Sequence, residues 1–242
     1  CELVFGEGPK SFGLATQWLP GEVEGLFRKS RLVGRRFRLA HVFFGRDIVE
    51  VATFRAQHDG DEEGGVVEDG MILRDNVYGT IEEDAVRRDF TVNALYYNIA
   101  DFSIWDYTGG VSDIKERRLV LIGDPEQRLR EDPVRMLRAA RFAAKLGFTI
   151  EPETEAPLYE LGYLLKDIAP ARLFDEVLKI FQSGHGVESY HQFRKYGLLE
   201  HVFSQTAYCL ENPGNAPVEQ LVLNALQNTD RRIQQDKSVT PA

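Results

Sequence analysis

Apolar and polar residues alternate along the first half of the chain in the way that strands require. Residues 39–44 and 48–54 are β-branched and aromatic runs joined by Gly45-Arg46-Asp47, which predicts a β-hairpin. Residues 20–27 predict a short helix that begins with a proline. Residues 58–70 are acidic and glycine-rich without periodicity, and predict a mobile loop.

The period becomes helical in the second half. Before that point, Thr80-Ile81-Glu82-Glu83 matches a capping box and predicts a helix through Val86. Residues 107–110 predict a turn, and residues 119–122 predict a short strand. Longer helices are then predicted at 132–146, closing at Gly147, and at 152–165, 170–182 and 187–196. The pattern predicts an α+β fold, with a β-sheet domain over residues 1–123 and an all-helical domain over residues 124–242.

Composition narrows the class of protein. The 242 residues suffice for one large or two small domains, and 43% hydrophobic with 28% charged residues is typical of a globular protein. No apolar run is long enough to span a bilayer, and the sequence shows no signal peptide. Cys1 and Cys209 cannot build a disulfide framework or a zinc site, so we expect a cytoplasmic protein.

The charge is unevenly distributed. A net charge of −9 argues against a protein that coats nucleic acid by bulk electrostatics. Acids gather at residues 59–69, whereas residues 28–38 hold only basic charges, namely Arg28, Lys29, Arg31, Arg35, Arg36 and Arg38. This contrast indicates a confined site for a polyanion.

Residues 87–95 concentrate polar chemistry at the start of an apolar segment. Arg87, Arg88, Asp89 and Asn93 stand there within seven residues, although an unpaired buried polar group costs about 2–7 kcal/mol. A bound triphosphate would explain them: the arginines would clamp phosphate oxygens, Asp89 would orient one arginine, and Asn93 would address the sugar. The alternative is an ordinary solvated helix start.

Two further segments in the first half carry candidate residues. Glu50 lies within the apolar strand 48–54, on the face of Ile48, Ala52 and Phe54, where a metal ion would be a suitable partner. The alternative is an edge strand whose glutamate faces water.

The second segment, at 34–38, places three basic residues just before the predicted strand at 39–44. Arg35, Arg36 and Arg38 suit the phosphates of a nucleotide or RNA, unless they form an ordinary basic surface loop. His41, which follows, is read as a strand-packing histidine.

The predicted helix at 132–146 carries arginines at every third position. Arg135, Arg138 and Arg141 form a slowly drifting stripe beside an apolar surface, where forked donors can bind a base edge and phosphates. Asp132, followed by a proline, is equally suited to cap the helix, and its two oxygens allow both roles.

Two stretches resemble hallmark motifs of the class II nucleotidyltransferases, the family of bacterial poly(A) polymerases and tRNA CCA-adding enzymes. They are RRDFTVNA at 87–94 and EDPVRMLRAARF at 131–142, and ARLFDE at 171–176 is similar to a later structural helix of the family. Residues 32–42 resemble the signature that separates the poly(A) polymerases from the CCA-adding enzymes.

The resemblance implies a sheet-containing head, a helical neck and body, and transfer of AMP from ATP to RNA 3′ ends at two Mg²⁺ ions. It implies that Arg88 contacts the triphosphate and Asn93 the ribose, that Asp132 and Arg135 read the base, that Arg138 and Arg141 assist, and that Glu50 is the third metal carboxylate.

The sequence departs from the family at the other two metal carboxylates. KSFGLAT at 10–16 aligns with a family pattern in which aspartates stand at the positions of Ser11 and Gly13. A hydroxyl and a bare glycine do not replace two anionic oxygen ligands. The glycine-rich phosphate loop that precedes them in the family has no match either, and both ends of the chain read as those of a longer protein.

Three functions therefore stay open. The first is a template-independent poly(A) polymerase, here as an N- and C-terminally incomplete piece with an impaired metal site. The second is a non-catalytic relative that binds nucleotides or RNA 3′ ends. The third is a tRNA CCA-adding enzyme, which the segment at 34–42 disfavours.

Overall fold

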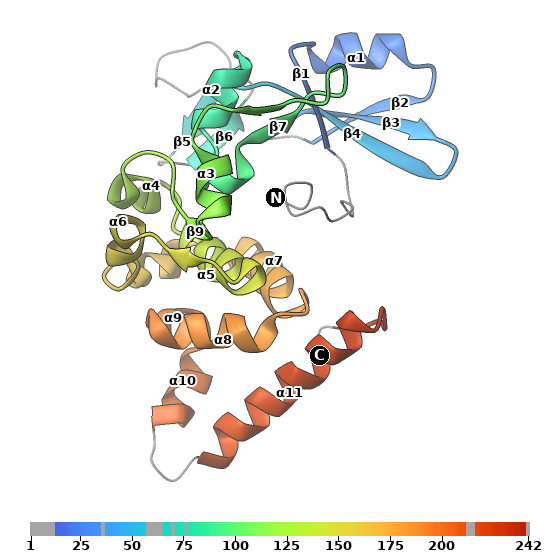
Figure 1. Ribbon diagram of the computed structural model, residues 1–242. Coiled ribbons are helices and arrows are strands. Elements are labelled where there is room, and N and C mark those ends of the chain that lie inside the picture. Colours follow the sequence, from blue (N-terminus) through green and yellow to red (C-terminus); the bar gives the residue numbers. More distant parts are fainter. Residues whose placement is uncertain are drawn as a thin grey trace. The chain divides into compact units, whose positions relative to one another are not determined.

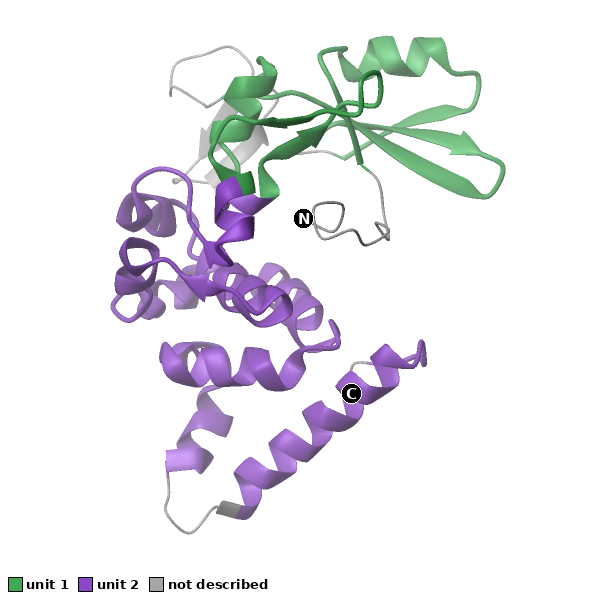
Figure 2. Ribbon diagram, in the orientation of Figure 1, with its two compact units in different colours: residues 1–89, 93–111 green, residues 90–92, 112–242 purple. Residues whose placement is uncertain are grey.

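The computed structural model describes residues 13–34, 37–56, 65–68, 71–75, 77–211 and 216–240 (Figure 1). The chain divides into two compact units, the first comprising residues 1–89 and 93–111 and the second residues 90–92 and 112–242 (Figure 2). The first unit contains the sheet and the second is mostly helical, so the predicted α+β fold is confirmed. The domain boundary at residue 123 stays a prediction.

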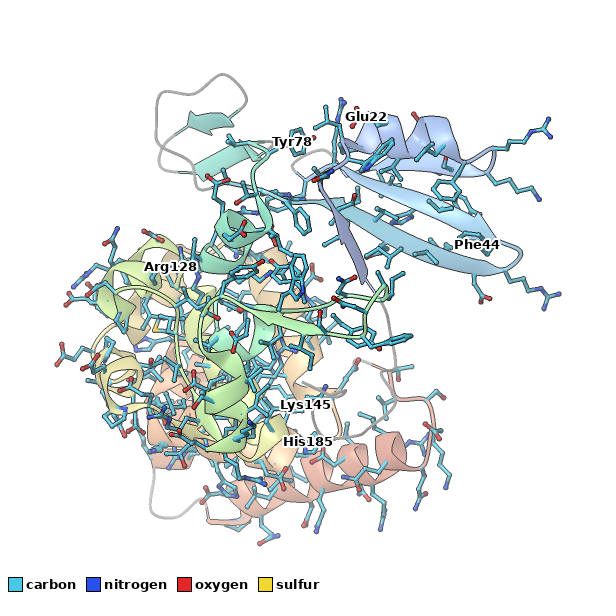
Figure 3. The ribbon with its side chains drawn as sticks, turned by 45° about the horizontal axis from the view of Figure 1, so that its top comes forward. Glu22, Phe44, Tyr78, Arg128, Lys145 and His185 are labelled. Atoms are coloured by element: carbon cyan, nitrogen blue, oxygen red, sulfur yellow. The ribbon has the colours of Figure 1, made fainter. Side chains whose placement is uncertain are left out.

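A four-stranded sheet organises the first unit, in the order β1-β4-β3-β2. Its strands are β1 (Gly13–Thr16), β2 (Ser30–Val33), β3 (Leu39–Phe44) and β4 (Asp47–Thr53). β1 runs parallel to β4, and the other pairs are antiparallel. The predicted hairpin of β3 and β4 is confirmed. Its turn is tighter than expected, because Asp47 pairs with Phe44 at the end of β3 (Figure 3).

The short helix predicted at 20–27 is α1 (Pro20–Leu26), and it covers one face of this sheet. Val23 of the helix packs with Ala40, Val42 and Val51 in a small apolar core. Alternation along β3 and β4 supplies these inward residues, since every second side chain of a strand faces the same side. The opposite face of β4 is left for polar chemistry.

Two further hairpins and one helix complete the first unit. β5 (Gly65–Glu68) pairs with β6 (Met71–Asp75), and β7 (Leu95–Tyr97) pairs with β8 (Ile104–Asp106). The prediction of a loop over 58–70 is therefore wrong at 65–68, where cross-strand pairing forms a strand that no local periodicity announces; the rest of that segment lies outside the described residues.

The helix α2 (Ile81–Val86) begins at the predicted capping box. The backbone N–H of Glu83 donates to Oγ1 of Thr80 over 3.3 Å, and the backbone N–H of Thr80 donates to Oε2 of Glu83 over 2.7 Å. Two otherwise orphaned donors of the first turn are thus satisfied. This fixes the start of the helix whose other end carries Arg87 and Arg88.

The second unit is built around α5, which packs against α7 and α8. Its buried core includes Phe90, Leu137, Ile180 and Phe193. The elements of this unit are α3 (Gly110–Lys115, which begins at the boundary), β9 (Arg118–Leu119), α4 (Pro125–Glu131), α5 (Val134–Leu146), β10 (Thr149–Ile150), α6 (Pro152–Glu155), α7 (Pro170–Phe181), α8 (Gly186–Lys195), α9 (Leu198–Val202), α10 (Ser204–Glu211) and α11 (Ala216–Gln234). No helix in the described ranges is long and apolar enough to cross a membrane.

The helix ends agree with the sequence in some places and not in others. Gly147 closes α5 in the left-handed conformation at φ 62°, as predicted. The helix predicted at 152–165 is wrong, because it stops after α6 and is followed by 3₁₀ turns at Ala156–Leu158 and Gly162–Asp167. Pro157 supplies no N–H for a longer helix.

We predict that Thr80→Ala lowers the free energy of unfolding of the first unit by about 1 kcal/mol, since it removes the hydroxyl cap of α2. Urea unfolding followed by tryptophan fluorescence measures this, because Trp18 and Trp105 both belong to the first unit. Thr80→Ser retains the hydroxyl and should retain most of the stability. Equal losses in the two variants would show that the cap is not the cause.

Candidate functional site

The first group of candidate residues lies on the parallel pair β1 and β4. Gly13 is aligned directly with Glu50, and His41 of β3 is aligned with Glu50 from the other side. Nε2 of His41 lies 3.4 Å from Oε1 of Glu50. The side chain of Glu50 is 60% exposed, and a Cβ placed on Gly13 would meet no atom within 4 Å.

The orientation of Glu50 agrees with the predicted alternation. Val51 and Thr53 of β4 are buried, whereas Ile48 and Glu50 are exposed on the opposite face. β4 lies between β1 and β3, so the alternative of an edge strand is wrong, although the glutamate does face solvent. His41 accompanies this carboxylate, so it does more than pack within the strand.

The residues at this position do not by themselves fit a two-ion magnesium site. Glu50 supplies one carboxylate and Gly13 supplies no side chain, while Ser11 lies outside the described residues. Across the part of the chain that the structure describes, no group of three or more His, Cys, Asp or Glu residues could hold a metal ion. Magnesium binding at Glu50 therefore stays a prediction.

The second group surrounds the end of α2. Oδ2 of Asp84 accepts hydrogen bonds from Nη2 of Arg88 over 2.9 Å, from Nε of Arg88 over 3.2 Å, and from the hydroxyl of Tyr96 over 2.6 Å. Nη1 of Arg87 lies 3.9 Å from Oδ1 of the same carboxylate. A single buried aspartate thus contacts both arginines of the motif, Arg88 through hydrogen bonds and Arg87 as a more distant ion pair.

Burial and charge shift the pKa values within this cluster. Burial alone lowers the pKa of Arg88, but the interactions with Tyr96 and Asp84 outweigh it and raise that pKa overall. Burial, together with the hydrogen bond to Asp84, raises the pKa of the Tyr96 hydroxyl. Arg88 therefore stays a cation and Tyr96 a neutral donor near neutral pH.

Sequence reasoning missed Asp84 and Tyr96. It gave the orienting role to Asp89, which stays a prediction. In the structure Asp84 contacts both arginines, and Oδ1 of Asp89 accepts from the side-chain amide of Asn93 over 3.1 Å. The spacing of Asp84 and Arg88, four residues apart on a helix, was a signal that could have identified the aspartate. Tyr96 had no comparable signal, since its strand reaches the helix only in the folded chain.

The basic segment is only partly described. Arg38 is exposed just before β3, and Arg35 and Arg36 lie outside the described residues. Its role with phosphates stays a prediction.

In the second unit, both oxygens of Asp132 are engaged. Oδ1 accepts from the backbone N–H of Val134, the first residue of α5, over 3.3 Å, but the N-cap position of α5 is Pro133, one residue further along the chain than predicted. Oδ2 accepts from Nη2 of Arg172, on α7, over 2.7 Å. Each carboxylate oxygen has two lone pairs, so Oδ2 has acceptor capacity beyond its bond to Arg172.

The arginines of α5 do not all point the same way. Arg135 turns back to α4, where it bonds the carbonyl of Arg128 and lies 3.5 Å from Glu131. The guanidinium carbons of Arg138 and Arg141 instead lie 5.3 Å and 4.5 Å from the centre of the Phe142 ring, in cation–π contact.

Arg141 is also held from the neighbouring helix. Its Nη2 lies 3.0 Å from Oε1 of Glu176 on α7, whose side chain is only 5% exposed. Nζ of Lys179 lies 3.4 Å from the other oxygen of this carboxylate. The acid at the end of the 171–176 segment thus anchors the third arginine of the stripe.

Comparisons with known proteins identify relatives of this chain. Family models described as "Poly A polymerase head domain" and "Probable RNA and SrmB- binding site of polymerase A" match residues 2–120 and 147–210. Poly(A) polymerase I of Salmonella typhimurium is 53% identical over 100% of this chain and 53% of its own length. The CCA-adding enzyme of Bacillus subtilis is 37% identical over 70% of the chain and 41% of its own length.

A solved structure has the same fold. The Bacillus stearothermophilus CCA-adding enzyme in complex with CTP superposes with a TM-score of 0.72 at 29% identity, over 87% of this chain and 50% of its own. The chain therefore belongs to the class II nucleotidyltransferases, the family of poly(A) polymerases and CCA-adding enzymes. Within it, the identity is higher to the bacterial poly(A) polymerase I, of which the chain spans about half the length.

We predict that Glu176→Gln lowers the free energy of unfolding of the second unit by about 3 kcal/mol, because it leaves the partly buried Arg141 without its anionic partner. Urea unfolding followed by far-ultraviolet circular dichroism reports on these helices. Asp175→Asn is the matched control: it removes an exposed acid from the same helix and should cost less than about 0.5 kcal/mol. Similar losses in both variants would contradict the role of the buried pair.

Proposed function

We propose that this chain is the head and neck of a template-independent poly(A) polymerase, which transfers AMP from ATP to RNA 3′ ends. The identity of 53% to poly(A) polymerase I over the whole chain supports this reaction. The structural observation that carries the proposal is the forked arginine pair held by one buried carboxylate, because guanidinium groups bind phosphate oxygens in fixed geometry.

The nucleotide contacts are assigned residue by residue. Arg88, with Arg87, would bind the triphosphate, and Asn93, oriented by Asp89, would lie by the ribose. Asp132 and Arg135 would read the adenine edge, while Arg138 and Arg141 would assist with base or phosphates.

RNA would be the second substrate. Arg35, Arg36 and Arg38 would contact its phosphates, which suits a confined basic segment on a chain of net charge −9. A chain with so few cysteines suits the reducing cytoplasm, where we place this activity.

This chain lacks two of the three metal-binding carboxylates that the family pattern contains. In the family, two magnesium ions supply charge stabilisation at the attacking and leaving oxygens. Here Gly13 stands opposite Glu50 where a second carboxylate would complete a pair, and Ser11 stands at the other aspartate position. We therefore propose that the chain binds ATP but transfers AMP poorly.

Two other functions are tested by the same assay. A non-catalytic relative would bind nucleotide and RNA 3′ ends through the arginine clusters that this chain retains. A CCA-adding enzyme would use CTP as well as ATP, and the lower identity to that group disfavours it.

The assay incubates the chain with an RNA primer, Mg²⁺ and each nucleotide singly. We expect ATP to be the nucleotide used, with slow addition or none. The variant with both Ser11→Asp and Gly13→Asp should add AMP at least about a hundredfold faster, since metal stabilisation of this kind contributes several kcal/mol. Addition from CTP that stops after two C residues, with a single A from ATP, would instead identify a tRNA enzyme.

Two controls separate a restored metal site from a general effect of charge. Gly21→Asp combined with Gly25→Asp adds the same two charges at other glycines whose Cβ positions are open, and should not accelerate the reaction. Glu50→Gln, introduced into the double aspartate variant, should abolish the gain. ATP binding without rescue would favour the non-catalytic relative.

A further inference from the structure

Asp84 is a buried acid whose side chain is only 10% exposed, and its carboxylate is fully engaged. Oδ1 accepts from the backbone N–H of Arg55 over 3.2 Å, while Oδ2 accepts from Arg88 and from the hydroxyl of Tyr96. A buried carboxylate is tolerated only when it is paired and hydrogen-bonded in this way. The position of the carboxylate is therefore set from three separate segments of the first unit.

Arg88 is held along its inner edge while its side chain stays accessible. Its Nε and Nη2 donate to Asp84, Nε also lies 3.0 Å from the hydroxyl of Tyr96, and Nη1 donates to the carbonyl of Asn93 over 3.3 Å. Nevertheless, 39% of the side chain is exposed. Such an arginine has lost its freedom before any ligand arrives and still presents a surface to solvent.

Tyr96 is itself fixed. Its ring packs edge-on against Phe54 with centroids 5.9 Å apart, and the guanidinium of Arg88 lies over the ring at 5.1 Å from its centre. The ring of Tyr96 therefore contacts the guanidinium of Arg88, and the hydroxyl hydrogen-bonds both to Nε of Arg88 and to Asp84. These contacts join β7 to the end of α2.

We propose that Asp84 and Tyr96 are positioning residues, which hold the Arg88 fork in the orientation that binds the triphosphate of ATP. The proposal rests on the proposed function, since it assigns Arg88 to the triphosphate. Its physical basis is preorganisation: an arginine already fixed by hydrogen bonds gives up less side-chain entropy when it binds an anion. Neither residue is expected to touch the nucleotide.

The test compares ATP with AMP in calorimetric titrations of the full chain. Tyr96→Phe removes the hydroxyl but keeps the ring and its packing on Phe54. We expect ATP to bind about threefold to tenfold more weakly, which corresponds to loss of one hydrogen bond to a charged network, and AMP to bind within about twofold of the unmodified chain. Tyr97→Phe, at the next position of β7, removes an exposed hydroxyl and should change neither affinity.

A double-mutant cycle shows whether Tyr96 acts through Arg88. Arg88→Ala should weaken ATP binding more than Tyr96→Phe does, and Tyr96→Phe should have no further effect once Arg88 is removed. Asp84→Asn should behave as Tyr96→Phe does; if that variant fails to fold, the cycle with Tyr96 is sufficient. Additive losses, or equal losses for ATP and AMP, would overturn the positioning role.

The outcomes separate this inference from the proposed function. If ATP binds and Arg88→Ala weakens it while Tyr96→Phe does not, the positioning role fails and the proposed function stands. If the unmodified chain has no affinity for ATP, the proposed function and the inference both fail. Thermal unfolding of each variant shows whether a loss of binding reflects loss of the fold.

Discussion

A carboxylate buried in a protein needs a cation or hydrogen-bond donors beside it. In this chain that constraint determines the positions of three candidate arginines, Arg87, Arg88 and Arg141. Asp84 fixes Arg87 and Arg88 at the end of α2, and Glu176 fixes Arg141 from the neighbouring α7. Each acid is less exposed than the arginines that it holds. The two acids are therefore buried, and the arginine side chains that pair with them are more exposed to solvent.

The second constraint is the register of a parallel strand pair. β1 and β4 align Gly13 with Glu50, so a carboxylate at position 13 would stand beside the one at position 50. No described atom lies within 4 Å of the Cβ position of Gly13, so a side chain there would have room beside Glu50. The departure from the family pattern at position 13 therefore concerns a side chain and leaves the pairing of β1 with β4 in place.

Local signals predicted what depends on local structure. The β3–β4 hairpin, the capping box of Thr80 and the glycine that ends α5 are each determined within a few residues, and all are confirmed. The strand at 65–68 depends on a partner strand, and the broken helix after α6 depends on a proline inside an apparently helical pattern. The contacts of Asp84 depend on Tyr96 from another element, so the motif at 87–95 gave no sign of them.

These constraints act on different parts of the first unit. The arginine fork is held by α2, β7 and the segment after β4, whereas the missing metal ligands belong to β1 and the residues before it. Because Asp84, Arg88 and Tyr96 satisfy one another's hydrogen bonds, their arrangement needs no metal ion to be stable. The residues at positions 11 and 13 take no part in these hydrogen bonds. Under the proposed function, affinity for a triphosphate and transfer of AMP therefore depend on different residues, and the two properties have to be measured separately.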